Sequence, residues 1–122
     1  AMKSKASTPR VDQPVRGSRS GRPVMVVLDL LGRRSTLRLL WELRDGQALT
    51  FRALQQAADT NPGVLNTRLA ELRESNLVGH DGEGYRLTPW GHELVEALGP
   101  LSAWSERWAA AQRRAARKQA AA

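Results

Sequence analysis

Residues 61–76 read NPGVLNTRLAELRESN and are the stretch on which the predicted fold depends. Asn61 is a favoured residue for capping a helix N-terminus, and Pro62 suits the first helical position, where no backbone N–H is needed. Three leucines recur with helical spacing, which predicts one apolar stripe facing a core. These leucines are Leu65, Leu69 and Leu72. The pattern therefore predicts a helix over this stretch.

The opposite face of this helix carries small or amide-bearing side chains instead of the Glu and Lys of an ordinary solvated surface. These residues are Gly63, Asn66, Thr67 and Ala70. Small residues allow a backbone to approach closely, and Asn and Thr side chains form hydrogen bonds with base edges and phosphates. The pattern favours a helix that lies in the major groove of DNA, with an ordinary amphipathic core helix as the alternative.

Composition indicates one small domain with basic tails. The 122 residues carry a net charge of +7, which divides into +5 over residues 1–23, −2 over 24–108 and +4 over 109–122. Basic segments flanking a nearly neutral domain favour a polyanionic partner, although such tails also serve solubility alone. The chain lacks cysteine and any signal-like or membrane-length apolar run. We therefore expect a cytoplasmic protein with no metal, no cofactor and no membrane partner.

The N-terminal segments differ sharply in composition. Residues 1–23 hold prolines and glycines among Ser and Arg, and they contain too little apolar surface to fold alone. We interpret them as a flexible arm that is ordered by a partner subunit or by DNA. Residues 24–31, VMVVLDLL, are interpreted as a helix that Gly32 terminates. Because this segment is apolar on every side, it is expected to pack against a second subunit.

Two more helices are predicted before residue 61. Residues 35–45 place Leu37, Leu40 and Trp41 on one side, and Leu39 and Leu43 extend that side. Ser35 stands at the start, where it either caps the helix or binds a phosphate. Residues 50–58 begin with a second capping residue and lead through a two-residue turn into the helix at 61–76. Two short helices joined by such a turn match a helix-turn-helix.

A short hairpin is predicted after residue 76. Apolar residues at 77–79 and 85–87 flank the Gly-rich segment HDGEG at residues 80–84. A hairpin that directly follows a helix-turn-helix is a wing. Its tip carries Asp81 and Glu83, and carboxylates held near phosphates are repelled. We therefore expect the tip to stay off DNA or to touch it weakly.

The last predicted helix has Thr88 as its cap and Pro89 at its first position, and it carries a heptad-like apolar stripe. The stripe consists of Trp90, Leu94, Ala97, Leu101, Trp104 and Trp108. Gly99-Pro100 interrupts it, and a kink or break is expected there because proline removes a backbone hydrogen bond. The tryptophans favour pairing with another subunit, with an aromatic ligand pocket as the alternative. Beyond the stripe the helix is expected to fray towards Arg117.

Four segments together resemble the HxlR-type winged-helix regulators of bacteria. They are LDLLGRRSTLRLLWELRDG at 28–46, TFRALQQAA at 50–58, NPGVLNTRLAELRESNLV at 61–78 and YRLTPWGHEL at 85–94. Their most specific parts are the Pro-x-Val-Leu-x-x-Arg-Leu-x-x-Leu pattern and the Leu-Thr-Pro-x-Gly pattern. The resemblance spans residues 24–108 and implies a homodimer that binds operator DNA and regulates transcription. It also implies that the first and last helices form the dimer interface.

Two features depart from this family. Members that sense oxidants or electrophiles use a cysteine near the start of the first helix, and this chain has no cysteine. The hairpin is also shorter than usual and acidic at its tip, so minor-groove contact by the wing is not expected. The basic N-terminal arm is a candidate substitute, by analogy with arms that reach the minor groove elsewhere.

We therefore predict a mainly α-helical winged helix-turn-helix with a small β-hairpin wing and a C-terminal dimerisation helix. The domain spans 24–108, between a basic arm at 1–23 and a basic Ala/Arg-rich tail at 109–122. The predicted contacts with double-stranded DNA are Arg34, Ser35, Thr36, Arg52, Asn61, Gly63, Asn66, Thr67, Arg68 and Arg86. The predicted homodimer contacts are Val24, Val27, Leu28, Leu31, Leu94, Leu101, Trp104 and Trp108. Arg68 has an alternative role as a salt-bridge donor to Glu71 or Glu42.

Other classes of function are weighed against DNA binding. Winged-helix domains also serve as protein-interaction modules without sequence-specific DNA binding, and the acidic wing and nearly neutral domain would suit that role. His80 is able to change charge near neutral pH, but a single wing histidine is more often a bystander. Catalysis is not expected, because the titratable residues show no catalytic arrangement in the sequence. Those residues are His80, His92, Asp81 and Glu93.

Overall fold

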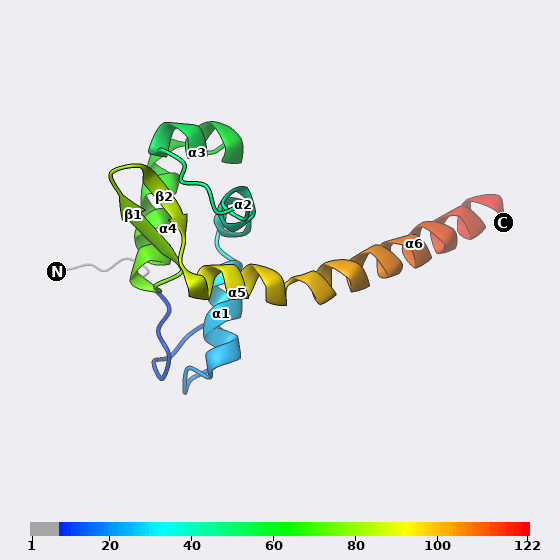
Figure 1. The fold of residues 1–122 in the computed structure, drawn as a ribbon. Helices are drawn as coiled ribbons and strands as arrows, with labels where there is room; N and C mark the ends of the chain where they lie inside the picture. The colour runs from blue at the N-terminus through cyan, green and yellow to red at the C-terminus, as the bar shows by residue number, and fades with distance from the viewer. Residues whose placement is uncertain (1–7) are drawn as a thin grey trace. The chain divides into compact units, whose positions relative to one another are not determined.

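The computed structural model describes residues 8–122, which form helices and one two-stranded antiparallel sheet (Figure 1). The helices are α1 (Pro23–Leu31), α2 (Thr36–Glu42), α3 (Phe51–Ala58), α4 (Pro62–Glu74), α5 (Pro89–Ala97) and α6 (Gly99–Ala121), and the strands are β1 (Val78–Asp81) and β2 (Gly84–Leu87). The first compact unit ends at His92, and the second comprises Glu93–Ala122. The unit boundary therefore falls inside α5, before the end of the domain that the sequence predicted at residue 108.

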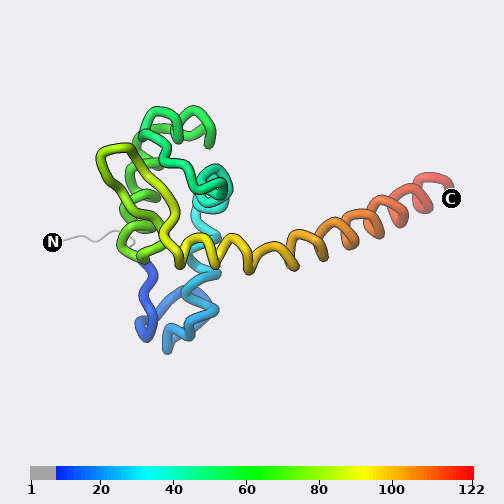
Figure 2. Tube along the Cα trace, in the orientation of Figure 1, coloured from blue at the N-terminus to red at the C-terminus, as the bar shows by residue number. Residues whose placement is uncertain are grey.

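Leucines from three helices build the core of the first unit. Leu39, Leu40, Leu43, Leu54, Leu65 and Leu72 are all fully buried. Leu37 and Trp41, predicted on the same side of α2 as Leu40, are instead exposed. Within this unit α2 packs against α3, and β1 packs against α4 (Figure 2). The predicted stripe on the helix at 61–76 is confirmed, because its leucines all face this core. The core thus fixes which face of α4 remains exposed.

Side-chain caps begin three of the helices. The Thr50 hydroxyl accepts a hydrogen bond from the Ala53 N–H at 3.1 Å, and the Asn61 side-chain oxygen accepts one from the Val64 N–H at 2.8 Å. Thr88 accepts from the Gly91 N–H at 3.1 Å in the same way. All three are positions where sequence predicted a cap, because an orphan N–H in the first turn needs a polar acceptor.

Ser35 does not cap α2 with its side chain. It occupies the N-cap position, but its backbone is left-handed, with φ of 71°, and its side chain makes no capping bond. The Ser35 hydroxyl instead donates to the Thr60 hydroxyl oxygen at 3.3 Å, which joins the start of α2 to the turn before α4. The capping role predicted for Ser35 is therefore wrong, because its left-handed backbone places the side chain toward Thr60.

The turn of the helix-turn-helix lacks the glycine that often occupies such a turn. Asp59 takes the left-handed conformation there, with φ of 50° and ψ of 54°. Asp and Asn tolerate this conformation better than other residues with a side chain, because their short polar groups bond locally. The sequence Asp59-Thr60 therefore supports the same tight connection between α3 and α4.

The hairpin is tighter than the sequence predicted. Pairing runs from Val78 opposite Leu87 to Asp81 opposite Gly84, so only two residues form the turn. His80 consequently lies in β1, and its ring stacks on Tyr85 with centroids 4.0 Å apart. Leu49 also pairs with Tyr85 through two backbone hydrogen bonds of 2.8 Å. A single paired residue leaves no periodic pattern, so the sequence does not indicate this third segment.

Part of the N-terminal arm packs on the helices within the first unit. Thr8 and Pro9 are buried, and the Thr8 hydroxyl donates to the Glu74 carboxylate of α4. The same arm residues line a cavity with Val26 and Leu30 of α1. Residues 8–22 are therefore tied to the helices, and residues 1–7 of the predicted arm lie outside the described part of the chain. The flexibility assigned to the arm stays a prediction.

The second unit is almost entirely helical. Leu98 separates α5 from α6, so the predicted break before Pro100 is confirmed. α6 runs to Ala121, beyond the predicted fraying near Arg117, because Ala and Arg favour helix. None of the residues of α6, all of which are described, is buried. Among residues 8–122, no helix is long and apolar enough to cross a membrane.

The start of α5 packs closely on the backbone before the hairpin. A Cβ on Gly91 would lie 2.2 Å from the Leu77 carbonyl oxygen. Gly91→Ala is therefore expected to lower the free energy of unfolding by about 1–3 kcal/mol, measured by chemical denaturation. The control is Gly63→Ala, whose Cβ would meet only the Asn61 side-chain oxygen, at 3.4 Å, and which should leave stability equal or slightly higher. Equal stability of the two variants would contradict the tight contact.

Candidate nucleic-acid interface

The face of α4 that turns away from the leucine core is exposed. Asn66 and Thr67 lie at its centre, and both are exposed. The Thr67 hydroxyl donates to the Gly63 carbonyl at 3.1 Å, so its oxygen remains available as an acceptor. Asn61, which caps the helix, and Gly63 are exposed at the same end of α4. Gly63, Asn66 and Thr67, which the sequence predicts on this helix for their small or polar side chains, are thus brought together with Asn61 on one accessible surface. Ala70, the fourth residue of that set, is exposed as well.

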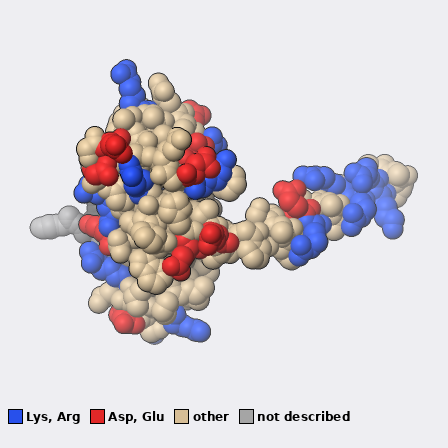
Figure 3. All heavy atoms as spheres, viewed as in Figure 1, with Lys and Arg blue, Asp and Glu red and all other residues tan. Residues whose placement is uncertain are grey.

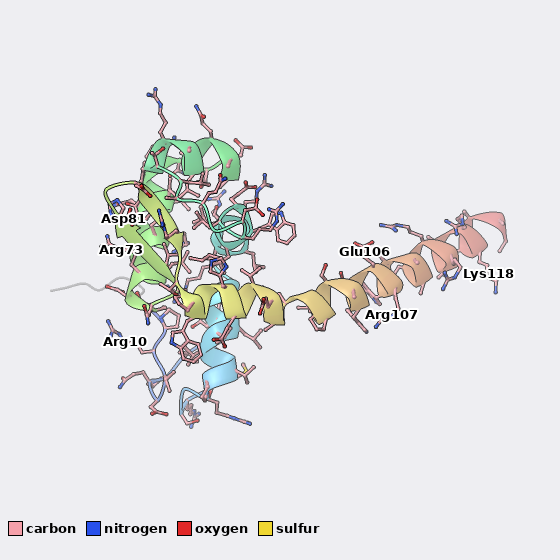
Figure 4. All side chains as sticks on the ribbon, in the orientation of Figure 1. Arg10, Arg73, Asp81, Glu106, Arg107 and Lys118 are labelled. Carbon is pink, nitrogen blue, oxygen red and sulfur yellow. The ribbon has the colours of Figure 1, made fainter. Side chains whose placement is uncertain are left out.

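Arg73 belongs to the same surface and was not predicted. It is exposed, and it follows Gly63, Asn66 and Ala70 at steps of 3, 4 and 3 along α4 (Figure 4). That spacing was visible in the sequence, because it is the helical period itself. Arg73 therefore supplies a positive charge at the C-terminal end of the exposed face of α4.

Salt bridges divide the arginines of the first unit into two groups. Arg38 pairs with Glu42 at 2.7 Å and donates to the Ala57 carbonyl at 2.9 Å. Arg44 stacks over the Trp41 ring, 4.0 Å from its centroid. Within helices α1–α5 and their loops, three exposed arginines form no ion pair with the described residues. They are Arg34, Arg52 and Arg73.

Arg68 is engaged inside the protein. Its guanidinium pairs with Glu71 at 2.8 Å, and its Nε donates to the Arg34 carbonyl at 2.9 Å. Of the two roles weighed for Arg68, the salt bridge is the one present, and its partner is Glu71 rather than Glu42. These bonds hold the guanidinium against the protein, so only its remaining N–H groups are available to a base.

Thr36 is unavailable to DNA. Its side chain is 0% exposed, so the predicted phosphate contact is wrong. Thr36 precedes Leu39 and Leu40 by one helical turn, and those leucines face the core, which places Thr36 on the same side. Its hydroxyl has no hydrogen-bond partner in the described part of the chain. Ser35, the neighbouring candidate, is half-buried.

The hairpin tip neutralises its own arginine. Arg86 pairs with Glu83 at 2.6 Å, and its Nε lies 4.0 Å from the Asp81 carboxylate. The Glu83 N–H, which donates to Asp81 at 2.8 Å, lowers the pKa of that carboxyl. The Asp81 carboxylate therefore stays negative at neutral pH, and Figure 3 shows acidic atoms gathered at this end of the hairpin. A phosphate approaching the tip meets negative charge before it meets Arg86.

Neutralising the hairpin tip is expected to strengthen binding to DNA of any sequence. Asp81→Asn with Glu83→Gln removes two negative charges and releases Arg86, while Asn still accepts the N–H of residue 83. The salt dependence of the affinity should steepen by about 0.9 for each phosphate that Arg86 reaches. The control is Asp45→Asn with Glu96→Gln, which makes the same change in charge outside the hairpin. Equal affinities in titrations of the two variants would contradict a repulsive tip.

Most of the predicted dimer contacts are exposed. In α1, Val24 and Leu28 are exposed and Val27 is half-buried, whereas Leu31 lies in the core and is unavailable to a partner. The remaining predicted contacts lie in the second unit. They are Leu94, which is half-buried, and Leu101, Trp104 and Trp108, which are 58%, 49% and 52% exposed. The rings of Trp104 and Trp108 stack with centroids 5.8 Å apart.

The succession of α3, a tight turn, α4 and a hairpin defines a winged helix-turn-helix. The exposed polar face of α4 is the surface with which proteins of this class enter the major groove. The model of the HxlR-like helix-turn-helix family matches residues 30–113. The chain belongs to this family, and the fold and the family resemblance predicted from the sequence are both confirmed.

Individual proteins agree with this assignment. The chain is 29% identical over 89 residues to MJ0925 of Methanocaldococcus jannaschii, an uncharacterized HTH-type transcriptional regulator, with 69% of this chain and 83% of that protein covered. It is also similar to the crystal structure of quinone-bound YodB from B. subtilis, with a TM-score of 0.64, 26% identity and coverage of 70% and 97%. It is similar as well to the structure of reduced HlyU from Vibrio cholerae, with a TM-score of 0.54 and 25% identity. That match covers 64% of this chain and 86% of HlyU. These likenesses support DNA-binding regulation and not an enzymatic class.

Proposed function

We propose that this protein is a sequence-specific DNA-binding transcriptional regulator that acts as a homodimer, with α4 in the major groove. The observation that carries the proposal is the exposed face of α4, where Asn66 and Thr67 stand free of the core and Arg73 forms no ion pair with the described residues. The exposed face of an amphipathic helix that has no external partner requires only solvated side chains. The amide of Asn66 and the small residues on this face of α4 are therefore explained by a partner. Membership of a helix-turn-helix family supports the same function.

Phosphate contacts position the helix, and base contacts select the sequence. Arg34, Arg52 and Arg73 are exposed and form no ion pair within residues 8–122, so they are the side chains assigned to phosphates. Asn66 and Thr67 are assigned to base edges, with Gly63 allowing the backbone to approach closely. Arg68 and Arg86 are assigned weaker roles, because both already pair with carboxylates.

A homodimer gives the exposed apolar side chains a partner. Leu101, Trp104 and Trp108 recur along one side of α6, and a helix of 23 residues with none buried does not stabilise itself through its own unit. Two-fold pairing would present two copies of α4 to major grooves one helical turn apart, roughly 34–36 Å. An operator with an inverted repeat follows from that symmetry.

The basic ends of the chain add affinity that does not depend on sequence. Lys118 and three arginines, Arg113, Arg114 and Arg117, are all exposed near the end of α6, and Figure 3 shows basic atoms along this helix. Each phosphate that such side chains neutralise adds about 0.9 to the slope of affinity against salt. The tails are therefore expected to make binding strongly dependent on salt.

Selection of bound sequences from a random DNA pool tests this function directly. The purified full chain should enrich an inverted repeat whose half-sites are separated by about one helical turn. Enrichment of no sequence would overturn the proposal. It would favour the protein-interaction module, for which the negative hairpin tip and its engaged Arg86 are the supporting observation.

A further inference from the structure

A buried carboxylate joins α4 to the end of α1. Glu71 is 5% exposed, and both of its oxygens are occupied. One accepts from Arg68 at 2.8 Å, and the other accepts from Arg33 at 2.7 Å. Arg33 also lies 3.8 Å from Asp29 of α1. The cluster thus ties the face of α4 next to Thr67 to the last turn of α1.

The same cluster holds the loop that carries Arg34. Besides pairing with Glu71, Arg68 donates its Nε to the Arg34 carbonyl at 2.9 Å. The next residue, Ser35, has a left-handed backbone, so the chain turns sharply directly after the exposed Arg34. Arg33, Arg68 and Glu71 also line a cavity of about 400 Å³ that reaches Thr67. One network therefore holds the backbone of a residue assigned to phosphate and lines the same cavity as a residue assigned to bases.

We propose that Glu71 and Arg68 are positioning residues for DNA recognition: they fix the Arg34 phosphate contact relative to the base-reading face of α4. This inference rests on the proposed function. A buried ion pair is a poor source of stability, because the desolvation of its charges offsets their attraction, and apolar replacements are often as stable. It does fix geometry, because each guanidinium bond has a preferred direction. Holding contact groups within about 0.5 Å is what a specific site requires.

A double-mutant cycle on the full chain separates positioning from stability. Arg34→Ala is measured in the parent protein and in Glu71→Gln, with the DNA sequence enriched by selection as the probe. In the parent it should weaken binding about tenfold, as expected for the loss of a charged hydrogen bond, and flatten the salt slope by about 0.9 per phosphate lost. In Glu71→Gln the same substitution should change affinity less than about twofold, because the Arg34 contact depends on Glu71 and the effects of the two substitutions do not add.

A second variant covers the case in which Glu71→Gln fails to fold. Arg68→Lys keeps a positive charge for Glu71 but lacks the Nε that donates to the Arg34 carbonyl, so it should remove the effect of Arg34→Ala in the same way. Glu42→Gln is the control, because it breaks an ion pair of 2.7 Å in the same unit without touching this cluster. In that background Arg34→Ala should keep its full tenfold effect.

Each outcome decides the proposal. Equal effects of Arg34→Ala in the parent, Glu71→Gln and Arg68→Lys would overturn positioning, even if the variants melt at lower temperature. An Arg34→Ala protein that binds as tightly as the parent would overturn it too. Failure of the proposed function looks different, because the parent chain would then enrich no sequence at all.

Discussion

Alanine at both Asn66 and Thr67 is expected to remove most of the preference for the selected operator while affinity for unrelated DNA stays the same. Both side chains are exposed on α4, so their loss leaves the leucine core intact. Each base contact contributes about 1–3 kcal/mol of discrimination, which is roughly a 5- to 150-fold change in the ratio of specific to nonspecific affinity. Competition titrations with operator and random duplex measure that ratio.

Thr67 offers a finer version of the same test. Its hydroxyl hydrogen is directed to the Gly63 carbonyl at 3.1 Å, which leaves the oxygen as an acceptor and the methyl group for apolar contact. Thr67→Val keeps the methyl and loses the acceptor, and Thr67→Ser does the reverse. The variant that retains preference identifies whether a donor on a base or the methyl of a thymine is contacted.

Arg52→Ala is the matched contrast for these variants. Arg52 is exposed on α3 and forms no ion pair with the described residues, so it is assigned to a phosphate. Its loss should weaken binding to all sequences alike and reduce the salt slope by about 0.9. If Asn66→Ala with Thr67→Ala behaved like Arg52→Ala, or changed nothing, α4 would not be reading bases.

The parts of this fold that the sequence predicts are those set by local chemistry. The caps at Thr50 and Asn61 form within three residues of their partners, and the stripe of α4 follows the period of one helix. The break at Leu98 follows from Pro100 in the same way. Such features depend on neighbours along the chain, so a pattern of a few residues contains them.

What the sequence does not predict depends on partners distant along the chain. Arg33 and Glu71 are 38 positions apart, and the residues around each of them do not predict their pairing. The place of Thr36 near a helix start predicts a phosphate contact, yet tertiary packing buries its side chain completely. Leu49 bonds Tyr85 across 36 positions of sequence. The candidate site is therefore predictable on α4 and less so around it, where long-range pairs decide which arginines remain free.

Replacing Trp104 and Trp108 by alanine is expected to convert the protein to monomers. Both side chains are about half exposed on α6, and their stacked rings form one apolar surface with Leu101. Large aromatic side chains contribute most of the binding energy in many interfaces, at about 2 kcal/mol or more each. Because a two-fold interface contains every residue twice, the loss applies to both subunits. Sedimentation across a range of concentrations measures the change.

Trp41→Ala is the control for this prediction. Trp41 is 54% exposed, comparable with the two α6 tryptophans, but it lies on α2, outside the predicted interface, beneath the Arg44 guanidinium. It should leave the dimer intact. A dimer that survives the change of both Trp104 and Trp108 would move the interface elsewhere, and the exposed Val24 and Leu28 of α1 would be the next residues to test.

Loss of the dimer has a separate consequence for DNA binding. In the proposed homodimer, two linked α4 helices would bind the second half-site at high effective concentration, so a monomer should lose about 10²- to 10⁴-fold in affinity for the full operator. Its preference for one half-site should persist, because α4 belongs to the first compact unit and Trp104 and Trp108 to the second. A monomer that also loses its preference for the half-site would mean that dimerisation determines the conformation of the α4 surface. Recognition of the DNA sequence would then depend on dimerisation.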